Sequence, residues 1–107
     1  MAGFARIQVP TSAKAGEAIE VRLSIRHPME TGFRVDDVGK TIARNTIKDF
    51  VCRYDGREVF RGSLGSGIAA NPYLRFWLTA TVSGDLVIEW IDDAGERGDA
   101  RAAINVA

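Results

Sequence analysis

The stretch Ile19-Glu20-Val21-Arg22-Leu23-Ser24-Ile25-Arg26 decides the fold class of this chain. Apolar and polar side chains alternate along it without a break. Successive side chains of an extended strand point to opposite faces of a sheet, so the alternation predicts a strand with one buried face and one solvated face.

The same alternation recurs on both sides of this stretch and predicts further strands at residues 4–9, 46–54, 57–64, 73–82, 85–91 and 99–106. Asp55-Gly56 predicts a tight hairpin, because a type I′ turn needs positive φ at both central positions. Strands this short and one-sided must stack two sheets to hide their apolar faces. The sequence therefore predicts an all-β, immunoglobulin-like antiparallel two-sheet sandwich of about seven strands, with a small closed barrel as the alternative.

Composition limits the range of functions. A chain of 107 residues, 46% hydrophobic and 26% charged, predicts one globular domain over residues 1–107 and argues against a membrane span. Lys plus Arg equals Asp plus Glu at 14 each, and the basic residues fall singly along the predicted strands, so we expect no nucleic-acid partner. Residues 1–17 hold no apolar run of signal-peptide length, which alone predicts a cytoplasmic protein.

The chain has little equipment for chemistry, with one cysteine and one histidine. Cys52 falls on the inward face of its strand, where a buried neutral thiol is the simplest interpretation. A bond to a partner's cysteine and a nucleophilic role beside His27 are the alternatives. One histidine makes a poor metal centre, so we expect no metal and no cofactor. The Asp36-Asp37 and Asp92-Asp93 pairs each stand two residues before a glycine, and turn chemistry explains them.

Several apolar side chains fall on the outward faces of the predicted strands. Ile47 and Val51 oppose Phe50, while Tyr73 and Trp77 lie on the polar side of their strand. Single exposed apolar groups are ordinary, but several on adjacent strands form a patch of the kind found at protein interfaces. We take Val51, Tyr73 and Trp77 as candidates for contact with a partner.

A long polar loop runs from His27 to Asn45. A structureless loop of this length in a compact domain is usually functional or mobile. One expectation is that it folds across the open end of the sandwich and plugs it with Met29 and Phe33. The other is that it docks on another protein, with candidate residues His27, Met29, Glu30, Phe33 and Arg34.

Two motifs are specific in combination: His27-Pro28-Met29-Glu30-Thr31-Gly32 and Ala70-Asn71-Pro72-Tyr73. Shorter matching pieces are Arg6-Ile7, Asp37, Gly39-Lys40, Arg44, Phe50, Asp55-Gly56-Arg57-Glu58-Val59-Phe60, Trp90 and Asp92-Asp93. With these residues the chain resembles the SoxZ family, the small subunits of the SoxYZ sulfur-carrier complex of bacterial thiosulfate oxidation.

The resemblance implies an immunoglobulin-like subunit that is not an enzyme and pairs with SoxY. In that family the cysteine of SoxY carries covalent sulfur intermediates to the other Sox enzymes, so Cys52, in mid-strand, is not the carrier thiol. The resemblance also implies a periplasmic location through export together with SoxY, which replaces the cytoplasmic expectation. A generic immunoglobulin-like binding or adhesion module, or a redox protein that uses Cys52, are the alternatives.

Overall fold

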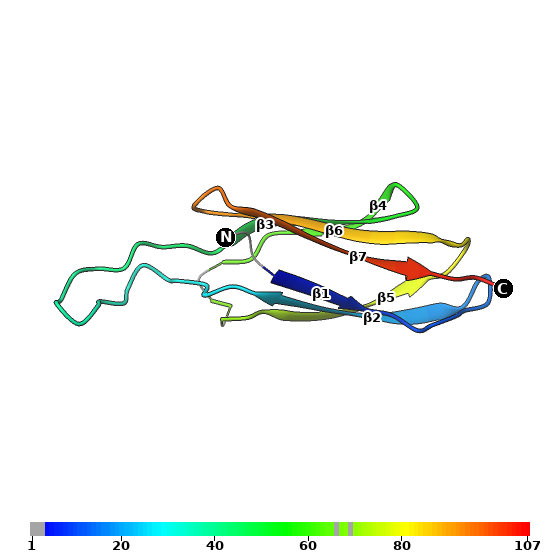
Figure 1. Ribbon diagram of the computed structural model, residues 1–107, viewed down its shortest axis with the longest axis horizontal. Helices are drawn as coiled ribbons and strands as arrows, with labels where there is room; N and C mark the ends of the chain where they lie inside the picture. Colours follow the sequence, from blue (N-terminus) through cyan, green and yellow to red (C-terminus); the bar gives the residue numbers. More distant parts are fainter. Residues whose placement is uncertain (1–3, 66, 69) are drawn as a thin grey trace.

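The computed structural model describes residues 4–65, 67–68 and 70–107, which form seven strands in two stacked antiparallel sheets (Figure 1). One sheet has the order β1-β2-β5 and the other the order β4-β3-β6-β7. The predicted immunoglobulin-like sandwich is confirmed, and the closed-barrel alternative is wrong. The strands are β1 Phe4–Gln8, β2 Ala18–Arg26, β3 Ile47–Tyr54, β4 Arg57–Gly62, β5 Tyr73–Thr79, β6 Gly84–Asp92 and β7 Arg97–Ile104.

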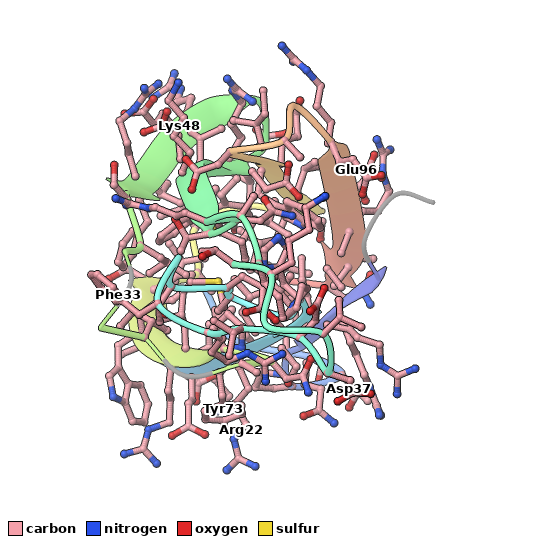
Figure 2. All side chains as sticks on the ribbon, turned by 90° about the vertical axis from the view of Figure 1, so that its left-hand side faces the viewer. Arg22, Phe33, Asp37, Lys48, Tyr73 and Glu96 are labelled. Carbon is pink, nitrogen blue, oxygen red and sulfur yellow. The ribbon has the colours of Figure 1, made fainter. Side chains whose placement is uncertain are left out.

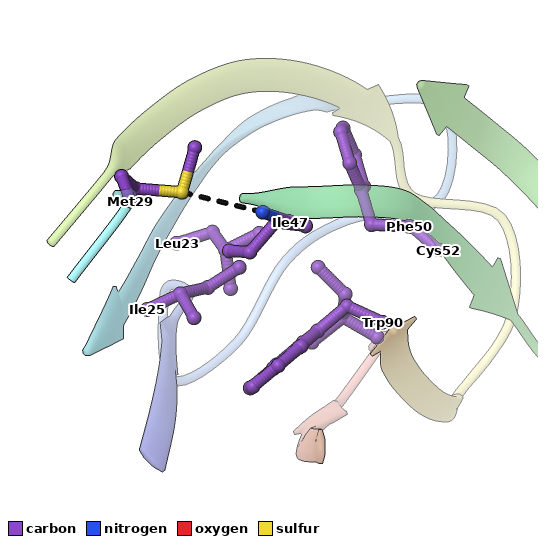
Figure 3. Close-up of a cluster of buried hydrophobic side chains, with 8 residues drawn as sticks. Leu23, Ile25, Met29, Ile47, Phe50, Cys52 and Trp90 are labelled. Carbon is purple, nitrogen blue, oxygen red and sulfur yellow. Dashed lines mark hydrogen bonds between the residues drawn. The ribbon is translucent and has the colours of Figure 1, made fainter. Parts of the chain in front are cut away.

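The core lies between the sheets and is built from the inward side of each alternating strand. In β2, Val21, Leu23 and Ile25 are each 1% exposed. Leu23 and Ile25 share a core cluster with Phe50 and Trp90 of the larger sheet (Figure 3), and Val21 belongs to a second cluster with Leu86. Burying a large aliphatic side chain contributes about 1.5–3 kcal/mol, so this row stabilises the contact between the sheets strongly. The predicted hairpin is also confirmed, since φ is 51° at Asp55 and 79° at Gly56.

Two large aromatic side chains lie over glycines of the neighbouring strand. Trp90 in β6 pairs with Gly98 in β7, and a Cβ added at Gly98 would lie 2.3 Å from the indole ring. Phe50 in β3 covers Gly62 in β4 in the same way, at 2.9 Å. These glycines leave the room into which the rings pack, so the inner surface of the larger sheet stays filled.

Two details of the predicted strands are wrong. Ile47 is fully buried instead of facing outward with Val51, because a bulge between Ile47 and Asp49 shifts the register against β6 by one residue. The fifth strand ends at Thr79 and does not continue to Val82. The hydroxyl of Tyr54 accepts the N–H of Val82 at 3.1 Å and donates to the Val82 carbonyl, which holds that segment in a turn.

Candidate interaction surfaces

The predicted long loop is an extended arm, defined here as residues 30–45, that projects from one end of the sandwich (Figure 1). Glu30 and Asn45 exchange two backbone hydrogen bonds at its base, of 2.8 and 2.9 Å. Further out, the N–H of Ile42 donates to the carbonyl of Arg34 at 2.8 Å. The arm is therefore an irregular two-stranded ribbon, and it helps to make the chain 57 Å long but only 19 Å across.

The arm carries apolar side chains into solvent. Phe33 is 88% exposed, Val38 86% and Val35 61%. The expectation that the loop plugs the sandwich end is confirmed for Met29, which is buried, and wrong for Phe33. A two-stranded ribbon on its own is marginally stable in water, and exposed apolar groups on a projecting element are typical of a surface that binds another protein.

His27 is buried at the root of the arm, only 4% exposed. Its Nδ1 accepts the N–H of Met29 at 2.9 Å, which leaves the proton on Nε2. Nε2 then donates to a carboxylate oxygen of Asp92, which is itself buried, at 3.0 Å. Both His27 and Met29 were candidates for docking, and this packing removes their side chains from the surface. Glu30, Phe33 and Arg34 remain accessible, with Arg34 Nε 3.1 Å from a carboxylate oxygen of Glu30.

Other side chains complete the root of the arm. The amide oxygen of Asn71 accepts the N–H of His27 at 3.0 Å, and the N–H of Asn71 donates to the His27 carbonyl at 2.8 Å. A carboxylate oxygen of Asp93 accepts both the N–H and the hydroxyl of Thr46, at 2.9 and 2.8 Å. These donors hold the pKa of Asp93 below its ordinary value. The arm is thus fastened to a rigid base.

Three sequence pieces that carry the family resemblance meet at this root: residues 27–32, 70–73 and 90–93. The interpretation of Asp92-Asp93 as turn residues alone is therefore incomplete. Asp92 does accept the N–H of Glu96 within the β6–β7 turn, at 2.9 Å, but its other oxygen binds His27. Sequence reasoning missed this pair because its members lie 65 residues apart.

The geometry around Cys52 does not favour nucleophilic chemistry. Cys52 is 2% exposed within the core, and burial raises the pKa of its thiol to about 11. The thiol is therefore protonated at neutral pH, whereas a nucleophilic cysteine must be a thiolate. His27 has both ring nitrogens engaged by Met29 and Asp92, which leaves neither nitrogen to act as a base.

The three candidates for partner contact lie on opposite faces of the molecule. Tyr73 and Trp77 point outward from β5 and are 55% and 65% exposed. Val51 is half-buried on the outer face of the other sheet, between Arg61 and Glu89. Figure 2 shows the same separation, with Tyr73 on one side of the molecule and Lys48 of β3 on the other. One flat interface cannot include all three residues.

The described residues form neither a metal-binding cluster nor a membrane-spanning helix. Among them no group of three or more His, Cys, Asp or Glu side chains is placed to hold a metal ion. That part of the chain likewise forms no helix long and apolar enough to cross a lipid bilayer.

Solved structures share this fold. Superoxide reductase (neelaredoxin) from Ignicoccus hospitalis superposes with a TM-score of 0.71 at 22% identity, over 96% of this chain and 80% of that one. The sulfur carrier protein SoxY from Chlorobium limicola f. thiosulfatophilum superposes with a TM-score of 0.64 at 13% identity, over 96% and 78%. A putative superoxide reductase from Thermotoga maritima gives 0.68 at 15%, over 96% and 85%. At these identities the likeness establishes the fold alone.

The sequence comparison is more specific. No curated protein matches the chain. The family model described as "Sulphur oxidation protein SoxZ", however, matches residues 7–103. That range runs from β1 into β7 and includes the arm, its root and the outward residues of β5. The chain therefore belongs to the SoxZ family of sulphur oxidation proteins.

Proposed function

We propose that this chain is the non-catalytic partner subunit of a SoxYZ-type carrier complex. It pairs with a SoxY-type subunit, whose cysteine carries the covalent sulfur intermediates of thiosulfate oxidation. The match of the SoxZ family model to residues 7–103 is the observation that carries the proposal. The likeness of this fold to that of SoxY is compatible with the proposal, because both subunits then have sheet faces of similar shape.

The chemistry of the chain supports the absence of a catalytic role. The buried Cys52 thiol is held in its neutral form, and both nitrogens of His27 bind inside the protein. In this proposal the chain supplies surfaces, while the reactive thiol belongs to the partner. No cofactor takes part in that role.

The arm provides a second surface, distinct from the sheet faces. Glu30, Phe33 and Arg34 stand on it beyond the buried root, and Phe33 is almost fully solvated. We assign the arm to transient contacts with the other Sox enzymes, because a projecting element can reach a visiting protein while a sheet face stays covered by the permanent partner. Membership of the family supports a periplasmic location beside SoxY.

Co-expression with a SoxY-type subunit from the same genome tests the pairing. The two chains are expected to co-purify at a 1:1 ratio, and the pair is expected to survive reducing agent because Cys52 is buried. A pair that dissociates when reduced would mean that a disulfide holds it. A chain that elutes alone would favour the generic binding module instead.

A further inference from the structure

The outer face of the β1-β2-β5 sheet gathers arginines that are scattered along the sequence. Strand register sets Arg22 directly opposite Arg75, and Ser24 opposite Tyr73. Arg6 of β1 lies on the other side of Ser24. Basic residues that are dispersed along the sequence therefore gather on this surface, which we call the arginine face. Its members are Arg6, Arg22, Arg26, Arg75, Tyr73, Trp77 and Glu20.

The arginine face has more positive charge than it can neutralise. Its acidic residue, Glu20, lies 2.5 Å from Arg22 and 3.7 Å from Arg75. Arg6 and Arg26 make no ion pair with any of the described residues. Like charges directly opposite each other across a sheet are destabilising. A covering surface that supplies carboxylates would remove that repulsion.

The outer face of the other sheet has balanced charges. Three of its arginines make ion pairs with their own neighbours: Arg53 with Glu89 at 2.6 Å, Arg61 with Glu58 at 2.6 Å, and Arg101 with Asp85 at 3.4 Å. Its acidic residues are Asp49, Glu58, Asp85, Glu89 and Asp99, and its arginines are Arg53, Arg61, Arg97 and Arg101. The chain as a whole is neutral, so the excess on the arginine face is a local feature.

Two exposed aromatic rings flank Arg75 along β5, namely Tyr73 and Trp77. Trp and Tyr, together with Arg, are the residue types that contribute most to binding at protein interfaces, whereas Lys and Glu are depleted there. Trp77 also lines a groove of about 540 Å³ that continues between β5 and β4, where Val59 and Val82 are exposed. Apolar anchors and positive charge therefore form one continuous surface.

We infer that the arginine face is where the SoxY-type subunit docks, and that the surface of that subunit covering it is acidic. This inference rests on the proposed function. A protein fits better than a nucleic acid, because the exposed rings of Tyr73 and Trp77 and the adjoining groove offer apolar contacts, and the chain has no net positive charge. Arginine also forms two parallel hydrogen bonds to a carboxylate, a geometry that fixed positions on a sheet support well. Val51 then lies outside this interface.

The test measures the affinity of the purified chain for the SoxY-type subunit, with charge reversals on one face at a time. The double variant Arg22→Glu/Arg75→Glu is expected to weaken binding by at least about 100-fold, since it sets like charges against each other across the interface. The matched control Arg97→Glu/Arg101→Glu changes two exposed arginines of β7 and is expected to alter affinity less than about 3-fold. Trp77→Asp is expected to lose about 30-fold.

Thermal unfolding of each variant checks that the fold is intact, and all five substitutions in the three variants fall on exposed positions. If the wild-type chain binds the subunit and the Arg22→Glu/Arg75→Glu variant binds it equally well, the inference is overturned while the proposed function stands. An equal loss of affinity in the Arg97→Glu/Arg101→Glu control has the same consequence. A wild-type chain that does not bind the subunit overturns the proposed function as well. Displacement of the subunit by a single-stranded dT12 oligonucleotide would contradict the choice of an acidic protein.

Discussion

His27 Nε2 lies 3.0 Å from a carboxylate oxygen of Asp92, and this buried contact joins the end of β2 to the end of β6 beneath the arm. The imidazole is positioned from its other side by the N–H of Met29. A strand end, the first residues of the loop and a turn from the opposite sheet thus meet at one side chain. The arm begins immediately beyond this junction.

His27→Ala is expected to lower the free energy of unfolding by about 3 kcal/mol, because it leaves the Asp92 carboxylate oxygen that binds Nε2 buried without a donor. Urea unfolding monitored by tryptophan fluorescence measures the change. Arg26→Ala, at the exposed neighbouring position, serves as the control and should stay within about 0.5 kcal/mol of wild type. A His27→Ala variant that loses less than about 1 kcal/mol would mean that the contact contributes little.

Gly98→Ala is expected to cost about 2 kcal/mol, because the added Cβ would overlap the ring of Trp90 at 2.3 Å. Gly65→Ala is the matched control, since nothing lies within 4 Å of its added Cβ. Thermal unfolding of both variants makes the comparison. Equal stability of the two would contradict the packing of the indole over the glycine.

The stability that Cys52 contributes should depend on alkaline pH. Burial raises its pKa from 9.0 to about 11, so the folded state keeps the thiol neutral where the unfolded chain already ionises. Its contribution is therefore complete below pH 9 and is lost progressively as the pH rises to about 11. The measurement is the difference in unfolding free energy between wild type and Cys52→Ala, which should fall across this window. Groups other than Cys52 titrate in both proteins, so their contributions cancel in the difference. A constant difference would show that the thiol ionises equally in both states.

The apolar side chains of the arm should be unimportant for folding. Phe33→Asp and Val38→Asp change residues that are 88% and 86% exposed, so unfolding free energies should stay within about 0.5 kcal/mol of wild type. The same variants should weaken contacts between the carrier complex and its enzymes while leaving the pairing with SoxY intact. Turnover of thiosulfate by the reconstituted system, compared with co-purification, separates the two effects. Loss of pairing in Phe33→Asp would assign the arm to the permanent interface.

Local pattern was sufficient to predict the strands. The alternation at residues 19–26 gave the buried row of β2, and Asp55-Gly56 gave the β3–β4 turn, because period and turn chemistry act between near neighbours. The bulge at Ile47 could not be predicted, since it depends on how β3 pairs with β6. A one-residue shift of that kind turns a side chain from one face to the other.

The candidate surfaces required the topology. Arg22 and Arg75 become neighbours only through the pairing of β2 with β5, and His27 meets Asp92 only when two sheets stack. Sequence alone identified Tyr73 and Trp77 as outward-facing, but it could not separate them from Val51 on the opposite sheet. It also left open whether the loop folds over the sandwich, because the anchoring partners of the arm lie on distant strands.

In the proposed complex this chain serves as a scaffold, and its partner carries the sulfur. Intact-mass spectrometry of both subunits after thiosulfate turnover by the reconstituted complex tests this assignment most directly. Sulfur adducts are expected on the SoxY-type subunit, and an unmodified mass is expected for this chain. A persulfide or thiosulfonate adduct on Cys52 would contradict it.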